Sequence, residues 1–173
     1  MKYAFFDINV KNESDGREYD IVGEDYKDLI DVCCKYSKYF SLVYLNNSEE
    51  VKNLLSPYIA TVDPARFEMY SEYLSPLRSK KIFYHVCPQT RAILCEHVDT
   101  LWSWISDRVF NNPEDLTFYR EDSSIFLKTV IHDGECALNV YDNENVSEII
   151  VHENWTKVSE LPQYFRNHWI MDV

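Results

Sequence analysis

The stretch LTFYREDSSIFLKTVIHDGECALNVYD, residues 116–142, decides the fold of this chain. Three runs within it are rich in the β-branched and aromatic residues that favour strands, and they are Leu116–Arg120, Ser124–His132 and Glu135–Asp142. Polar residues separate the first two runs, and Asp133-Gly134, which suits a tight primed turn, separates the last two. The pattern predicts three antiparallel strands joined as a meander.

Further strands and helices are predicted outside the meander. Two β-prone runs, residues 2–10 and 17–22, are expected to pair as a hairpin. Three other runs predict single strands, and they are Ser41–Leu45, Lys80–Cys87 and Val146–Val151. Helical spacing of apolar residues indicates helices from Glu24 to Phe40, between Ser48 and Pro57, from Asp63 to Ser75 and, as the longest, from Pro88 to Val109. Residues 155–173 form an aromatic tail, which we expect to pack as a short helix or an irregular cover.

The composition limits the architecture. With 173 residues, 46% of them apolar, the chain can bury a substantial core. Only three glycines are present, and the sequence shows no repeat, low-complexity segment or linker. We therefore expect one α+β domain over residues 1–173, with a largely antiparallel sheet whose C-terminal β-meander packs against three to four helices.

The chain is strongly acidic, with 17 Lys and Arg against 29 Asp and Glu and a formal net charge of -12. Such a charge repels phosphate backbones and anionic lipids, so neither nucleic acid nor a membrane is expected as a partner. Residues 1–7 lack the apolar core of a secretory signal, and no stretch approaches the roughly 20 apolar residues of a membrane span. The five cysteines fit reduced thiols better than a disulfide framework. A cytoplasmic protein is predicted.

Motifs for nucleotide or metal chemistry are missing or badly spaced. Both dinucleotide and P-loop motifs need clustered glycines, whereas the glycines here are Gly16, Gly23 and Gly134. His85 and Cys87 share one face of a predicted strand, but Cys95 and His97 point about 200° apart on a predicted helix, so the four cannot converge on zinc. We therefore expect no cofactor and no metal site.

His132 and Cys136 are candidate catalytic residues of an enzyme. They flank Asp133-Gly134, and a Cys/His pair, or His132 with a nearby carboxylate, is the minimum for thiol or acid–base catalysis when the groups are within hydrogen-bond reach. Neighbours across a turn are more often solvent-facing or packed, so we assign no catalytic residue. A small hydrolase or transferase remains the alternative to a binding protein.

An acidic ribbon covers the last strands. Between Thr129 and Thr156 there is no lysine or arginine. The carboxylates of this ribbon are Asp133, Glu135, Asp142, Glu144, Glu148 and Glu153. Folding gains little from charge of one sign, so the ribbon predicts a basic partner.

Aromatic residues exceed what one small core requires, with 13 Tyr, 9 Phe and 4 Trp. On the predicted long helix, Trp104 lies about 110° from the centre of the apolar stripe, so we expect it to be partly exposed. Tyr119 and Tyr141 lie on meander strands beside acidic residues, and Tyr and Trp commonly anchor interfaces. The alternative is that these rings pack in the core beneath the aromatic tail.

Three segments carry a resemblance to a known group of proteins. They are Trp102-Ser103-Trp104, Asn112–Arg120 with its Pro-Glu-Asp-Leu-Thr-Phe-Tyr segment, and Ile131–Glu135. Together they resemble an uncharacterised bacterial family, some members of which look like the immunity partners of polymorphic toxins. The match spans roughly residues 100–136, and it implies no catalytic residue.

We therefore predict a non-catalytic acidic binding protein, an immunity or antitoxin-type inhibitor that neutralises a cognate toxin domain by direct binding. The partner is expected to be a basic toxin domain, which acidic residues attract and exposed aromatic residues hold. The predicted contact residues are Trp104, Tyr119, Glu121, Asp122, Tyr141, Asp142, Glu144 and Glu148. The alternatives are a hydrolase or transferase using His132 with Cys136 or a nearby carboxylate, and an adaptor that forms a homodimer through its aromatic surface.

Overall fold

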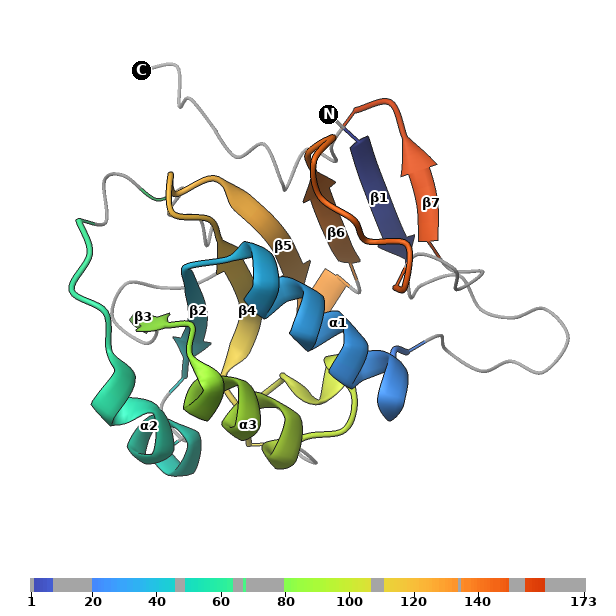
Figure 1. Cartoon of the computed structure of the whole chain (residues 1–173). Helices are drawn as coiled ribbons and strands as arrows, with labels where there is room; N and C mark the ends of the chain where they lie inside the picture. Colours follow the sequence, from blue (N-terminus) through green and yellow to red (C-terminus); the bar gives the residue numbers. More distant parts are fainter. Residues whose placement is uncertain are drawn as a thin grey trace, which may run out of the picture.

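The described part of the chain folds into a seven-stranded antiparallel sheet and three α-helices (Figure 1). The computed structural model describes residues 2–7, 20–45, 49–63, 67, 80–106, 111–133, 135–149 and 155–160. The strands are β1 (Lys2–Asp7), β2 (Tyr39–Tyr44), β3 (Lys80–His85), β4 (Glu114–Tyr119), β5 (Ile125–Val130), β6 (Glu135–Val140) and β7 (Trp155–Val158). The helices are α1 (Glu24–Tyr36), α2 (Glu49–Leu55) and α3 (Pro88–His97).

The strand order is β3-β2-β4-β5-β6-β1-β7, and every pairing is antiparallel. Phe118 of β4 is paired with Leu127 of β5, which is paired with Leu138 of β6, so the predicted meander is confirmed. Strand β1 enters between β6 and β7, with Ala4 paired to Leu138 on one side and to Lys157 on the other. The α+β class with an antiparallel sheet is therefore confirmed.

The helices cover one face of the sheet, as Figure 1 shows for α1, α2 and α3. Leu29 of α1 and Leu94 of α3 are buried with Phe118 and Leu138 in the main hydrophobic core. Complete burial of an apolar side chain of this size contributes about 1.5–3 kcal/mol. On the opposite face of the sheet, four strand residues form a second hydrophobic cluster with Ala60 and Phe67, which precede β3. The four strand residues are Phe83, Tyr119, Ile125 and Ala137. Both faces of the central strands β4, β5 and β6 are therefore buried.

The long helix predicted from Pro88 to Val109 is shorter in the structure. Helix α3 ends at His97, and Val98 is extended, with φ -137° and ψ 157°. Thr100 then caps a short 3-10 helix, because its Oγ1 accepts a hydrogen bond from the Ser103 N–H at 3.1 Å. The helical spacing of apolar residues continues past Val98, and for this reason the sequence predicts one long helix.

The predicted N-terminal hairpin is wrong where the structure describes it. Residues 2–10 and 17–22 cannot pair along Tyr3–Phe6, because β6 occupies one edge of this segment and β7 occupies the other. Val22 makes only an isolated bridge to Thr100. The place beside β1 that was predicted for residues 17–22 is therefore taken by strands from much later in the chain, β6 and β7.

Two predictions near the end of the meander are also wrong. Four residues separate the paired Val130 and Glu135, and Ile131–Asp133 form a 3-10 helix, so the two-residue primed turn does not occur. Residues 147–149 form a turn where a strand is predicted, and the additional strand is β7, within the predicted tail. Gly134 and most of the helix predicted from Asp63 to Ser75 lie outside the described residues.

None of the helices in the described ranges combines the length and the apolar character that crossing a bilayer requires.

Candidate functional site

Two loops meet at one end of the sheet, one joining β4 to β5 (residues 120–124) and one following β6 (residues 141–149). In the first loop the Arg120 N–H donates to Ser124 O at 2.8 Å, and Ser123 adopts a positive φ of 71°. Asp122 Oδ1 accepts hydrogen bonds from the Ser124 N–H at 2.9 Å and from Ser124 Oγ at 2.6 Å. These bonds close the turn and fix the Asp122 carboxylate.

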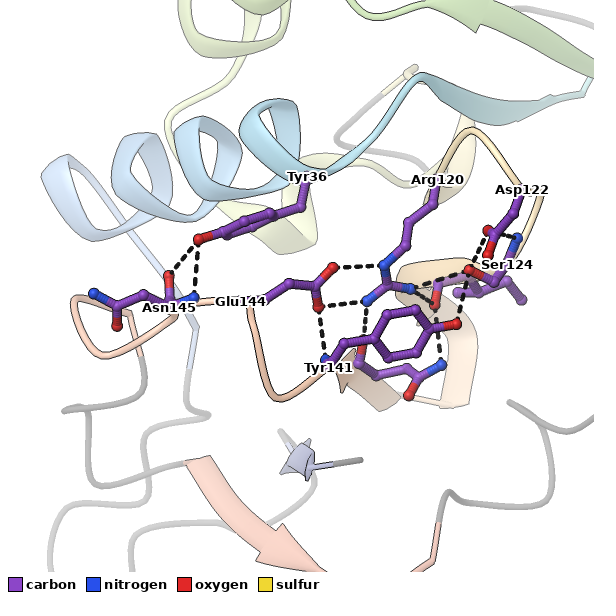
Figure 2. Close-up of polar contacts among 9 residues, drawn as sticks. Tyr36, Arg120, Asp122, Ser124, Tyr141, Glu144 and Asn145 are labelled. Atoms are coloured by element: carbon purple, nitrogen blue, oxygen red, sulfur yellow. Dashed lines mark hydrogen bonds and ion pairs between the residues drawn. The ribbon is translucent and has the colours of Figure 1, made fainter.

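A buried ion pair fastens the two loops together (Figure 2). Arg120 Nε donates to Glu144 Oε1 at 2.6 Å, and Arg120 Nη2 donates to Glu144 Oε2 at 2.7 Å. The Arg120 and Glu144 side chains are only 8% and 6% exposed. A bidentate pair with so little water around it has strong geometric specificity, and either partner left alone would be a costly buried charge.

The remaining donors of Arg120 are also satisfied. The guanidinium donates to three further oxygens, which are Ile125 O at 2.8 Å, Ser124 Oγ at 3.3 Å and Asn139 O. Its central carbon lies 3.9 Å from the centroid of the Tyr141 ring, within the range of a cation–π contact. Arg120 therefore connects the two loops to the adjoining strands β5 and β6.

Side chains also order the second loop. Glu144 Oε2 accepts a hydrogen bond from the Tyr141 N–H at 2.7 Å, and Tyr141 Oη lies 3.1 Å from Ser124 Oγ. At the end of α1, Tyr36 Oη accepts from the Asn145 N–H at 2.9 Å and donates to Asn145 O at 3.3 Å. The loop is thereby attached to both the β4–β5 turn and α1, as Figure 2 shows.

The acidic loop surface is the name we give to the acidic residues and Tyr141 on these two loops that reach the solvent. Its carboxylates are Glu121, Asp122, Asp142 and Glu148, all exposed, and its aromatic residue Tyr141 is half-buried. Hydrogen bonds from Ser124 favour the ionised form of Asp122 and lower its pKa below the usual value. Five of the eight predicted contact residues therefore lie at this surface.

Trp104 and Tyr119 are wrong as contact residues, because both are 0% exposed. Trp104 Nε1 donates to Tyr26 Oη at 2.8 Å, so the polar edge of the indole is satisfied inside the core. Tyr119 lies in the second hydrophobic cluster, and its hydroxyl is 3.2 Å from Ser41 Oγ. The break in the predicted helix after His97 turns Trp104 inward, contrary to the expectation from helical spacing.

Glu144 is also wrong as a contact residue, since the internal pair with Arg120 uses its carboxylate. Of the rest of the acidic ribbon, Glu135 is half-buried, while Glu153 and the side chain of Asp133 lie outside the described residues. Exposed carboxylates also occur on the helices, at Glu24, Asp25, Asp28, Asp31, Glu49 and Glu50. Negative charge is therefore not confined to the acidic loop surface, and what distinguishes that surface is its ordered loops and its aromatic residue.

Arg120, Ser124, Tyr36 and Asn145 are the site residues that sequence reasoning missed. Arg120 ends a predicted strand and precedes two acids, a pattern that favours exposure to solvent. Its actual partner, Glu144, lies 24 residues further along the chain. The one available signal was that Arg120 belongs to the segment carrying the family resemblance.

The enzyme alternative has a contact of its own, at the opposite end of β4. His132 Nε2 lies 3.0 Å from Glu114 Oε1, which also accepts a hydrogen bond from the Ser106 N–H at 2.9 Å. The His132 side chain is 60% exposed, whereas that of Glu114 is 1% exposed. Burial raises the pKa of Glu114 above its usual value. A buried carboxylate thus orients an exposed imidazole.

Cys136 does not belong to that arrangement. It is 0% exposed and lies in the main core beneath the helices. Burial raises the pKa of its thiol well above the usual value, which disfavours the nucleophilic thiolate. The prediction that Cys136 acts with His132 is therefore wrong. The version of the enzyme alternative that remains uses His132 with the carboxylate of Glu114.

Across the described ranges, no group of three or more His, Cys, Asp and Glu side chains is arranged to hold a metal ion. His97, one of the four residues considered for zinc, instead places Nε2 2.8 Å from Asn112 Oδ1. That contact ties the end of α3 to the segment before β4.

No protein-family model, curated protein or solved structure matches this chain. The resemblance to immunity proteins therefore stays a prediction.

Proposed function

We propose that this protein is a non-catalytic binding protein, an immunity or antitoxin-type inhibitor that neutralises a basic toxin domain by direct contact. The observation that supports it most is the acidic loop surface, where two mutually fastened loops carry four exposed carboxylates and the half-buried Tyr141. An inhibitor of this kind needs no catalytic group, because covering the substrate site of the toxin is sufficient.

The charge of the chain suits such a partner. A toxin that acts on nucleic acid must present a cationic surface to phosphates, and a protein with a net charge of -12 attracts that surface at long range. Complementary charge mainly raises the association rate and the specificity of a complex. Exposed carboxylates such as Glu121 and Glu148, for which no ion pair is seen in the described residues, are free to act in this way.

The order of the loops supports tight binding. Arg120, Glu144 and Tyr36 hold both loops in place through the described side-chain bonds. A surface that is ordered before contact loses less conformational entropy on binding than a flexible loop does. The contact residues proposed from the structure are Glu121, Asp122, Tyr141, Asp142 and Glu148.

The test uses the product of the neighbouring gene as the partner and two variants with equal charge. The first variant, Glu121→Gln, Asp122→Asn and Glu148→Gln, removes three carboxylates from the acidic loop surface. The matched control, Glu50→Gln, Glu96→Gln and Asp99→Asn, removes three exposed carboxylates elsewhere. We expect the first variant to weaken binding by roughly tenfold, chiefly through the association rate, and to flatten the salt dependence.

Two results would contradict the proposal. One is equal weakening by both variants, because only the net charge would then matter. The other is the absence of any binding to the neighbouring product under low-salt conditions. The homodimer alternative is tested in the same samples, since light scattering would show a mass that rises with concentration and falls in Tyr141→Ala.

The His132–Glu114 contact favours one second candidate, an acid–base hydrolase or transferase. In that case His132→Ala must abolish the activity, whereas His85→Ala, which removes another exposed histidine, must leave it intact. Activity that survives His132→Ala would remove this candidate.

A further inference from the structure

Tyr141 is an unusually well-fixed aromatic residue for one that still reaches the solvent. Its ring stacks on the Arg120 guanidinium at 3.9 Å, its hydroxyl lies 3.1 Å from Ser124 Oγ, and its N–H donates to Glu144 at 2.7 Å. The residue is nevertheless only half-buried. A ring held in this way loses little rotamer freedom when another molecule packs against it.

A carboxylate is fixed beside the ring. Ser124 Oγ donates to Asp122 Oδ1 at 2.6 Å and also lies 3.1 Å from Tyr141 Oη, so one hydroxyl holds the carboxylate and the phenol as neighbours. Asp122 is exposed, and Glu121 is exposed next to it. The positive charge of Arg120 does not oppose a second cation here, because Glu144 neutralises it in a bidentate pair.

This combination matches the chemistry of a guanidinium group. A planar guanidinium can stack on an aromatic ring and at the same time donate an N–H group to a neighbouring carboxylate, whereas an ammonium group has no planar face to stack. The protein already contains one such arrangement, since Arg120 stacks on Tyr141 and donates to both oxygens of Glu144.

We propose that Tyr141 and Asp122 form a recognition site for an arginine side chain of the partner. The inference rests on the proposed function and makes it more specific, because it selects arginine over lysine within a basic surface. It also assigns different roles to residues of the acidic loop surface. Glu121 and Glu148 attract the basic partner, and Tyr141 selects arginine over lysine.

The experiment measures binding of fluorescent nona-arginine and nona-lysine peptides by anisotropy at two salt concentrations. We expect the wild-type protein to bind the arginine peptide roughly two- to fivefold more tightly than the lysine peptide, the ratio that one exposed cation–π contact supports. Tyr141→Leu should abolish the preference by weakening binding of the arginine peptide to the affinity of the lysine peptide. The matched control is Tyr58→Leu, which removes a half-buried tyrosine elsewhere and should retain the preference.

The outcomes separate this inference from the proposed function. Equal binding of the two peptides by the wild type, or a preference that survives Tyr141→Leu, would overturn the arginine site and leave the acidic surface intact. Failure of both peptides to bind even at low salt would overturn the proposed function itself. Should Tyr141→Leu not fold, Asp122→Asn decides the matter, because an arginine preference unchanged in that variant refutes the site.

Discussion

The buried Arg120–Glu144 pair makes a strong prediction about stability. Arg120→Met keeps the length and much of the packing of the side chain but removes its charge and all its donors. Glu144, 6% exposed, would then keep only the Tyr141 N–H at 2.7 Å as a described partner. Removing one member of a buried pair costs about 3–5 kcal/mol, which is a large fraction of the roughly 5–15 kcal/mol that stabilises a folded domain.

The protein contains a matched control for this change. Arg91 pairs with Asp31 through two hydrogen bonds of 2.6 and 2.9 Å, but these side chains are 40% and 49% exposed. Water already solvates both groups, so Arg91→Met should cost no more than about 1 kcal/mol. The two variants therefore compare the same substitution at pairs of similar geometry and different burial.

Urea unfolding, followed by circular dichroism, measures both free energies. Combining Arg120→Met with Glu144→Gln should restore part of the loss, because the glutamine carries no charge and its oxygen can still accept from Tyr141 N–H. If Arg120→Met destabilised the protein no more than Arg91→Met does, burial would not control the strength of this pair. The view that Arg120 holds the loops in place would then be wrong.

Three further predictions concern the core and the buried groups. Trp104→Phe should lower the free energy of unfolding by about 1–3 kcal/mol, since it deletes the bond to Tyr26 and leaves a cavity, and partner affinity measured on the folded protein should not change. Burial raises the pKa of Asp20, so the folded state binds its proton more readily than the unfolded state, and stability falls as pH rises through that raised pKa. Asp20→Asn should reduce this fall in urea unfolding series between about pH 4 and pH 7, and an unchanged slope would contradict the assignment. Cys33 and Cys136 should react with a thiol reagent only after unfolding, whereas the half-buried Cys87 should react in the native protein.

Local patterns in the sequence predicted the parts of the fold that local forces determine. Alternating apolar residues such as Leu116 and Phe118 predicted the meander, because one face of each strand must be buried. The end of α3 was missed, because apolar spacing continues past Val98 while the backbone becomes extended. Strand β7 was missed because β1, its partner among the described strands, lies about 150 residues earlier in the chain.

The same distinction applies to the candidate site. Exposed carboxylates in turns, such as Glu121 and Asp122, follow from polar runs between strands and were predicted at the surface. The burial of Trp104 depends on a bond to Tyr26, 78 residues away, and the burial of Glu144 depends on Arg120. Contacts between such distant residues leave no local signal, so helical spacing placed Trp104, and the run of acidic residues placed Glu144, in the wrong environment.

The position of β1 has a consequence for how the protein forms during synthesis. Residues Tyr3–Phe6 need partners that the ribosome adds more than a hundred residues later, at Cys136–Asn139 and Trp155–Val158. In a nascent chain that stops before residue 135, Tyr3–Phe6 should stay unpaired and accessible to chaperones or proteases. Once residue 158 has left the ribosome, β1 can pair with both β6 and β7. Completion of the sheet therefore reports that translation has passed residue 158.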